Sequence, residues 1–106
     1  MQTIKSTQQY IDNIESNKGV TSVLFTQADS NCARCNQAKH TIKNLKVGIP
    51  VFDMPTVMDQ YPANILGVKT VPTLVIFKNG FEVSRLSGTS PELYKKEYQS
   101  VLHNNY

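Results

Sequence analysis

The stretch that decides the fold reads Thr26-Gln-Ala-Asp-Ser-Asn-Cys-Ala-Arg-Cys-Asn-Gln-Ala-Lys39. It holds Cys32 and Cys35, the only two cysteines among 106 residues. The pair stands where the apolar run at 23–25 gives way to a helical pattern. Two intervening residues let one helical turn bring both sulfurs within bonding distance, so oxidation can close a small ring without rearranging the fold. A Cys-x-x-Cys pair at a strand-to-helix junction within a βαβ pattern predicts a redox-active dithiol.

The segments on either side of this stretch alternate between helical and strand patterns. Helices are predicted at 6–17, at 32–46 and from Ser90 onward, a short helix or loop at 59–66, and strands at 20–26, 50–54, 74–77 and 81–86. This alternation indicates parallel strands, and the Asn79-Gly80 pair indicates an antiparallel hairpin. We therefore predict one α/β domain over residues 1–106, with a central mixed sheet of about four to five strands flanked by helices.

Smaller signals mark the ends and the buried faces of the helices. Ser6 and Gln9 form a capping-box pattern at the start of the first helix. Gly48 is predicted to cap the second helix at its C-terminus. The last helix is predicted to pack against the rest of the domain through Leu93, Tyr94, Val101 and Leu102.

Composition and charge exclude several classes of partner. Hydrophobic residues make up 40% and charged residues 18% of the chain, as in a soluble globular domain. The net charge of +3 is spread over scattered lysines and arginines, so we expect no nucleic-acid partner. No stretch approaches the length of a membrane span, and the first residues lack the apolar core of a signal peptide. We expect a cytoplasmic protein without a membrane partner, in which a disulfide is transient and catalytic.

The two cysteines are expected to differ in reactivity. Cys32 falls at the predicted helix N-terminus, where unpaired backbone N–H groups favour an anion, and Arg34 adds a positive charge nearby. Both features favour the thiolate, which is the nucleophilic form of cysteine. Cys35 lies on the apolar stripe of the same helix and should remain a thiol until it is needed. We predict that Cys32 attacks a substrate disulfide and that Cys35 resolves the mixed disulfide.

Metal binding is the alternative use of a cysteine pair. A structural zinc site needs four ligands, and His40 and His103 are the only histidines in the chain. His40 follows Cys35 at a spacing that places it on another face of the helix. We expect no metal site, and no cofactor apart from the redox-active disulfide between Cys32 and Cys35.

The chain resembles thioredoxins over nearly its whole length. The resemblance rests on the leading helix, Cys-Ala-Arg-Cys at 32–35, Thr-Val-Pro-Thr at 70–73, Phe-Lys-Asn-Gly at 77–80, Gly88 and the final helix. It implies a thioredoxin fold, a protein-disulfide reductase activity, and a cis peptide bond before Pro72 beside the dithiol. The substrate-binding surface that it implies consists of Asn31, Ala33, Arg34, Thr70, Val71, Pro72 and Gly88, with the backbone of Val71 pairing with an extended substrate.

The active-site motif departs from the usual Trp-Cys-Gly-Pro-Cys of thioredoxins. Asn31 stands in place of the tryptophan, Ala33 in place of the glycine and Arg34 in place of the proline. The loss of the proline and the added cation should stabilise the reduced form. We therefore predict a reduction potential more oxidising than that of a typical thioredoxin.

A second departure concerns the proton of the resolving cysteine. Thioredoxins usually carry a buried aspartate on the central strand, whereas residues 23–26 offer no carboxylate. Asp53 falls where the family often has a lysine. We predict that Asp53 takes over the proton shuttle from the neighbouring strand. The alternative is that Asp53 merely ends a strand in solvent.

The resemblance also implies partners, and it leaves two rival interpretations open. The implied protein is a monomer that acts on disulfide-containing proteins, ribonucleotide reductase among them, and receives electrons from thioredoxin reductase. A glutaredoxin-like enzyme that uses glutathione is the first rival, because residues 70–72 and 87–90, followed by Glu92, resemble that family's glutathione-binding segments. The second rival is a non-catalytic thioredoxin-fold subunit of a larger complex, against which the intact Cys-x-x-Cys argues.

Overall fold

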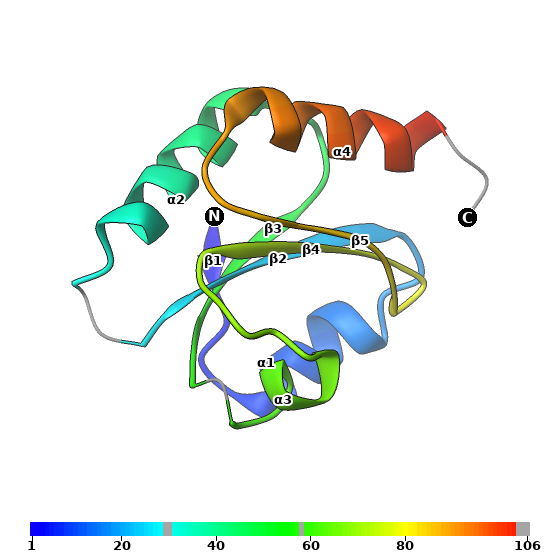
Figure 1. Ribbon diagram of the computed structural model, residues 1–106. Coiled ribbons are helices and arrows are strands. Elements are labelled where there is room, and N and C mark those ends of the chain that lie inside the picture. Colours follow the sequence, from blue (N-terminus) through cyan, green and yellow to red (C-terminus); the bar gives the residue numbers. More distant parts are fainter. Residues whose placement is uncertain (29–30, 58, 104–106) are drawn as a thin grey trace.

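A five-stranded mixed sheet lies between two layers of helices in the computed structural model, which describes residues 1–28, 31–57 and 59–103 (Figure 1). The strands are β1 (Gln2–Thr3), β2 (Val20–Gln27), β3 (Val51–Thr56), β4 (Thr73–Lys78) and β5 (Phe81–Ser87). Their order across the sheet is β1-β3-β2-β4-β5. β1 and β2 both pair with β3 in parallel, whereas β4 is antiparallel to β2 and β5. The predicted α/β class and mixed sheet are therefore confirmed.

The helices cover both faces of this sheet. They are α1 (Thr7–Tyr10), the π-helix η1 (Ile11–Glu15), α2 (Ala33–Leu45), α3 (Ala63–Leu66) and α4 (Pro91–His103). In Figure 1, α2 and α4 lie on one side of the sheet, and α1 and α3 lie on the other. The element order agrees with the prediction except for β1, a two-residue edge strand that the sequence analysis did not predict.

The alternation of side chains along β2 divides the core into two clusters. Leu24 packs with the residues of α2 and α4, while Val23 and Phe25 pack with those of α1, η1 and α3. All three side chains are fully buried, because β2 is covered on both faces and paired on both edges. Thr26 follows Leu24 on the α2 side by the same alternation. The position of each residue along β2 thus determines which helical layer it meets.

The first predicted helix contains a change of helix type. Ser6 caps it as expected, since its hydroxyl accepts a hydrogen bond from the Gln9 N–H at 3.1 Å. The α-helical hydrogen bonds end after Tyr10, and the Ser16 N–H donates to the carbonyl of Ile11, five residues back, at 2.9 Å. A single helix over 6–17 was therefore only partly right, because α1 continues into the wider π-helix η1.

One prediction about a helix end was wrong, and one about the buried face of a helix was right only in part. α2 is capped by Lys46, which adopts the left-handed conformation at φ 50°, so Gly48 lies beyond the cap. On α4, Tyr94 and Val101 are buried as predicted, whereas Leu93 and Leu102 are about half exposed and Tyr98, which was not predicted, is fully buried. The Tyr98 hydroxyl shares a 2.8 Å hydrogen bond with Ser22, which supplies the partner that a buried tyrosine requires. Neither leucine belongs to a core cluster of the described residues, whereas Tyr98 does.

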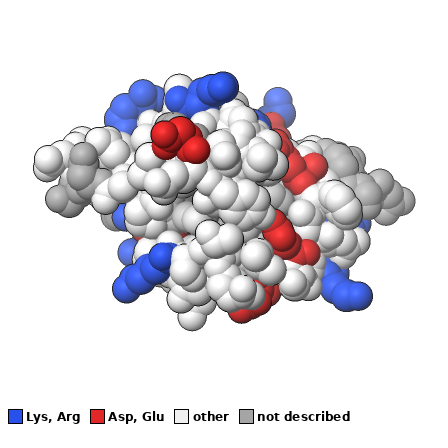
Figure 2. All heavy atoms as spheres, turned by 90° about the horizontal axis from the view of Figure 1, so that it is seen from below, with Lys and Arg blue, Asp and Glu red and all other residues white. Residues whose placement is uncertain are grey.

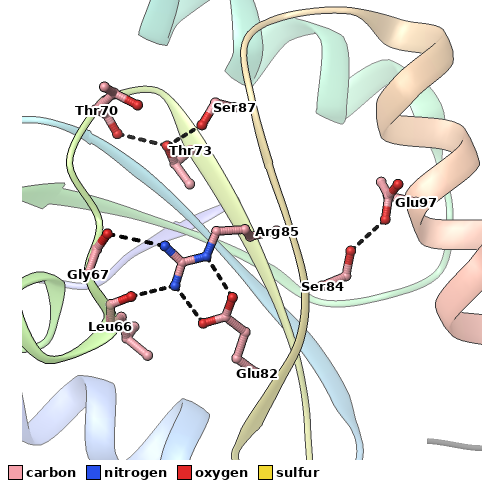
Figure 3. A network of polar contacts seen from close by, with 9 residues as sticks. All are labelled: Leu66, Gly67, Thr70, Thr73, Glu82, Ser84, Arg85, Ser87 and Glu97. Atoms are coloured by element: carbon pink, nitrogen blue, oxygen red, sulfur yellow. Dashed lines mark hydrogen bonds and ion pairs between the residues drawn. The ribbon is translucent and has the colours of Figure 1, made fainter.

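Polar side chains connect the β4–β5 hairpin to its neighbours (Figure 3). Arg85 of β5 donates to the carbonyl oxygens of Leu66 and Gly67 at the end of α3, and it binds Glu82 through two 2.6 Å contacts. This hydrogen bonding with Glu82 raises the pKa of Arg85. Ser84, on the same strand, donates to Glu97 of α4 at 2.6 Å. β5 is therefore tied to helices on both faces of the sheet.

The hairpin turn packs against the end of η1 through a glycine. Asn79 and Gly80 have φ angles of 54° and 82°, which confirms the predicted two-residue turn. A Cβ atom added to Gly80 would lie 2.4 Å from the carbonyl oxygen of Glu15, whereas real Cβ contacts are longer than 3.0 Å. Gly80 is therefore required both by its backbone angle and by this close approach.

Gly80→Ala should lower the free energy of unfolding by about 2–4 kcal/mol, because it adds a clash with Glu15 to the cost of a left-handed alanine. Gly67→Ala is the matched control: Gly67 also has a positive φ of 68°, but an added Cβ would meet no atom within 4 Å. It should cost only about 1–2 kcal/mol. Urea denaturation of both variants measures the difference, and equal losses would contradict the proposed contact.

Stability should fall at alkaline pH because buried tyrosines resist ionisation. Burial raises the pKa of Tyr94 and of Tyr98 to about 12, from 10.0 for a free tyrosine. Above pH 10 the unfolded chain releases these protons while the folded chain retains them, so stability is lost as the pH rises toward 12. Urea midpoints measured across this range should decline, and more shallowly for Tyr98→Phe. A flat profile would show that the tyrosines ionise freely in the fold.

Candidate active site at the Cys32–Cys35 disulfide

The candidate site lies where several strand ends meet at one edge of the sheet. Phe25, near the end of β2, pairs with Thr73 at the start of β4, and Thr73 also pairs with Ser87 at the end of β5. The end of β2 also pairs with the end of β3 through Gln27 and Thr56. This register brings the segment before β4 and the segment after β5 to the end of β2, which leads to the cysteines.

The two cysteines form a disulfide at the N-terminus of α2, with a sulfur–sulfur distance of 2.10 Å. Cys32 is the N-cap residue, in an extended conformation, and its Sγ accepts a hydrogen bond from the Cys35 N–H at 3.1 Å. Cys32 is half-buried, whereas Cys35 is only 2% exposed. The predicted helix-start position is confirmed, and a large molecule can approach only the sulfur of Cys32.

The motif residues around the disulfide are on the surface. Asn31, Ala33 and Arg34 are all exposed, as a substrate-binding role would require. The positive charge of Arg34 also acts on Tyr94 of α4: burial raises the pKa of that tyrosine, and Arg34 opposes the rise. Arg34 thus lies near the start of α4 as well as beside the cysteines.

The predicted residues of the Pro72 segment are held together at this edge. The Val71–Pro72 peptide bond is cis, as the resemblance to thioredoxins implied. The Gly88 N–H donates to the carbonyl of Pro72 at 3.3 Å. Thr73 donates to the carbonyl of Thr70 at 2.7 Å and contacts the Ser87 hydroxyl at 3.1 Å (Figure 3). A second cis bond, between Tyr61 and Pro62, was not predicted and lies outside this group.

Asp53 is buried rather than placed in solvent, so the alternative interpretation of this residue was wrong. It is 6% exposed within β3 and points to the α2 side of the sheet. Its Oδ1 accepts a hydrogen bond from the Thr26 hydroxyl at 2.8 Å, and its Oδ2 lies 3.2 Å from the Nζ of Lys39. A buried carboxylate normally has such partners, because burial without them is costly.

A hollow of about 300 Å³ lies directly beside the disulfide. Its lining consists of Thr26, Gln27, Ala28, Cys32, Cys35, Asn36, Lys39 and Pro55. Asp53 does not line the hollow, but its carboxylate contacts two residues that do, Thr26 and Lys39. The hollow is therefore lined by both cysteines together with Thr26 and Lys39, whose side chains contact the carboxylate of Asp53.

Thr26 and Lys39 are the members of this site that the sequence analysis missed. Two periodicities could have indicated them. Thr26 follows Leu24 on the same face of β2, and Lys39 comes one helical turn after Cys35 on α2. Both patterns point toward Asp53 only once the pairing of β2 with β3 is known.

Neither a metal site nor a membrane-spanning helix is found within residues 1–28, 31–57 and 59–103. No group of three His, Cys, Asp or Glu side chains there is arranged to hold a metal ion. No helix in the same parts of the chain has the length and apolarity needed to cross a membrane.

Comparison with solved structures places this geometry in a known fold. A mutant thioredoxin from Halobacterium salinarum matches with a TM-score of 0.80 at 22% identity, covering 99% of this chain and 93% of its own. The thioredoxin of Trypanosoma brucei brucei matches with a TM-score of 0.79 at 17% identity, covering 96% and 90%. That of Malassezia sympodialis gives 0.77 at 21%, covering 93% and 88%.

No protein-family model matches the sequence. The structural matches extend over nearly the whole of each chain. At these identities they establish the architecture rather than the activity. The resemblance seen in the sequence is thus confirmed for the fold: this chain has the thioredoxin fold.

Proposed function

We propose that the protein is a thiol-disulfide oxidoreductase that reduces protein disulfides, with Cys32 as the nucleophile and Cys35 as the resolving cysteine. The observation that carries the proposal is the disulfide at the start of α2, with one accessible and one buried sulfur. An accessible thiolate can attack a substrate, while a buried thiol beside it can attack only the resulting mixed disulfide. The geometry thus favours one order of events.

The reaction begins with both cysteines reduced. The Cys32 thiolate attacks one sulfur of the substrate disulfide, and the other substrate sulfur leaves as a thiolate and takes up a proton. The Cys35 thiol then loses its proton and attacks the Sγ of Cys32, so that the second substrate sulfur leaves. The substrate gains two electrons, and the Cys32–Cys35 disulfide is formed. The Cys35 N–H stabilises the Cys32 thiolate, because it already donates to that sulfur in the disulfide.

Asp53 is proposed to receive the Cys35 proton through Thr26. Cys35 is too deeply buried to release the proton directly into bulk water. Thr26 lines the same hollow as Cys35, and its hydroxyl donates to Asp53, so this hydroxyl can accept one proton on its oxygen while passing its own to Oδ1. A water molecule fits in the hollow and can bridge Cys35 to Thr26. Lys39 fixes the carboxylate from the other side.

The exposed residues of the site are proposed to bind the substrate protein. Asn31, Ala33 and Arg34 surround the accessible sulfur, and the backbone of Val71 can pair with an extended peptide. Thr70, Pro72 and Gly88 hold that backbone in place through the hydrogen bonds described above. The proposed substrates are disulfide-containing proteins, with ribonucleotide reductase as one candidate.

The electron donor distinguishes this proposal from the glutaredoxin-like alternative. A monomeric cytoplasmic protein of the proposed kind would be reduced by thioredoxin reductase, whereas the alternative requires glutathione. Turnover measured with each donor in turn separates the two functions. A non-catalytic subunit would turn over with neither donor and would keep its function when both cysteines are replaced by serine.

Cys32→Ser should abolish reduction of a protein disulfide such as that of insulin, since no nucleophile remains at the accessible position. Cys35→Ser should instead attack the substrate once and accumulate as a mixed disulfide, because the resolving thiol is missing. Non-reducing electrophoresis and mass spectrometry detect this adduct. If Cys32→Ser formed the adduct and Cys35→Ser did not, the proposed roles would be reversed.

Asp53→Asn should slow resolution of the mixed disulfide by about 10²-fold, because loss of a positioned base typically has effects of this size. The initial attack by Cys32 should be nearly unchanged. Asparagine can still accept the hydrogen bond from Thr26, so the fold is preserved. Rapid-mixing kinetics with acid trapping separate the two steps.

Two further variants make this test specific. Thr26→Val should slow the same step, since valine cannot relay a proton, whereas Asp59→Asn, at an exposed carboxylate, should have no effect. The relay is wrong if Asp53→Asn resolves the mixed disulfide at the rate of the unmodified protein.

A further inference from the structure

A second hollow, of about 440 Å³, lies away from the dithiol, where α1, α3 and the β4–β5 hairpin meet. It opens on the face of the sheet opposite α2, near the end of β4 that is remote from Pro72. Four aromatic residues and two glutamates contribute to its lining: Tyr10, Tyr61, Phe77 and Phe81, with Glu15 and Glu82. We call it the aromatic hollow. Its volume is within the range of small-molecule sites.

The rings of the aromatic hollow are arranged edge to face around Tyr10. The centroid of Tyr10 lies 5.8 Å from that of Tyr61 at an interplanar angle of 90°, and 6.3 Å from that of Phe77 at 77°. Phe81 is 76% exposed at the rim, and Ile65 beside it is 74% exposed. The hollow thus presents aromatic rings in several orientations, together with exposed apolar side chains at its rim.

The hydroxyl of Tyr10 is the polar group without a protein partner at this site. Only 3% of the Tyr10 surface is exposed, and its backbone N–H donates to Ser6 at 3.1 Å. Its hydroxyl has no hydrogen bond to another described residue, and because it is not fully buried it reaches the solvent in the hollow. Burial raises its pKa, and the negative charges of Glu15 and Glu82 raise it further. Tyr10 therefore remains a neutral phenol whose oxygen can accept a hydrogen bond, and both carboxylates lie near it.

Glu15 supplies a negative charge to the hollow that forms no ion pair within the described part of the chain. Glu82 binds Arg85 with both oxygens, whereas Glu15 has no ion pair among the described residues. Lys18 and Glu15 both line a neighbouring hollow, but Lys18 forms no ion pair with Glu15. Because the π-helical hydrogen bonds join residues five apart, η1 brings Glu15 to the same side as Tyr10.

The charge distribution around this face agrees with that assignment. Figure 2 shows the molecule from the α1 and α3 side: uncharged surface covers most of the centre, acidic side chains lie on it, and lysine and arginine are mostly at the periphery. A cation can therefore reach the centre of the face without passing a cluster of positive charges.

We propose that the aromatic hollow binds a small primary ammonium ion on an apolar stem. The ammonium group donates hydrogen bonds to the Tyr10 hydroxyl oxygen and to the Glu15 carboxylate, and it lies against the electron-rich faces of the rings. The stem covers Phe81 and Ile65 at the rim. A neutral apolar ligand would leave Tyr10 and Glu15 without partners in a less hydrated site, and an anion would be repelled by Glu15.

The first test compares phenylethylammonium with phenylethanol, a neutral molecule of similar shape, by amide-detected NMR titration of the full chain. The amine should shift the amide signals of Tyr10, Ile65 and Phe81 and should bind about fivefold more tightly than the alcohol, as expected for one charge-assisted contact. Equal affinities, shifts confined to other parts of the chain, or no amine-specific shifts would overturn the proposal.

Variants identify the groups responsible. Glu15→Gln should weaken amine binding about fivefold and leave the alcohol unaffected, while Glu92→Gln, which removes an exposed carboxylate on α4, should change neither. Tyr10→Phe should also weaken the amine selectively, because it removes only the accepting oxygen. Protein-disulfide reduction should be unchanged in every variant. Unchanged amine affinity in Glu15→Gln would refute the assignment while leaving the proposed redox function intact.

Discussion

The burial of β2 on both faces and its pairing on both edges is the constraint on which the rest of the structure depends. Val23, Leu24 and Phe25 are fully buried, and the strand is hydrogen-bonded to β3 on one side and to β4 on the other. A strand held in this way cannot shift by one residue without turning apolar side chains toward the wrong layer. The point at which β2 ends is therefore fixed, and with it the start of the chain segment that carries the cysteines.

The polar residues of β2 show how specific this arrangement is. Ser22 and Thr26 point to the α2 side, and each has a partner from another element, Tyr98 and Asp53 respectively. Thr21 is equally buried, but its hydroxyl has no partner within the described residues. A buried unpaired hydroxyl typically costs about 1–3 kcal/mol. β2 thus contains one buried hydroxyl without a partner, that of Thr21, and two whose partners come from α4 and β3.

Local sequence signals were sufficient for most elements and for the redox pair. The Cys-x-x-Cys at a strand-to-helix junction, the Asn79-Gly80 turn and the apolar run of β4 each depend on neighbouring residues, and each was predicted correctly. The edge strand β1 was missed because two exposed polar residues carry no strand pattern, and its existence depends on pairing with Phe52 and Asp53. The π-helical end of the first helix was likewise hidden, since the apolar spacing fits an α-helix equally well.

The candidate site was also predictable only in part, because contacts between distant segments cannot be read from local sequence patterns. The cysteines and Asp53 could be named from the sequence, but the environment of Asp53 could not, because Thr26 and Lys39 reach it from two other elements. The aromatic hollow was not predicted at all. Its members come from both halves of the chain, and Glu15 faces Tyr10 because of a helix type that the sequence pattern does not reveal.

The hydrogen bond from the Cys35 N–H to the Sγ of Cys32 has a consequence for how the two redox forms differ. A sulfur atom caps α2 in the disulfide, and the same sulfur can accept the same bond as a thiolate. The first turn of the helix therefore needs no new cap when the covalent bond opens. The oxidised and reduced forms then differ in the Cys32–Cys35 bond and in the charge on Cys32, while the first turn of α2 keeps its conformation. The difference that a partner protein meets at the surface is then at the half-buried Cys32, whose sulfur is bonded to Cys35 in one form and free in the other.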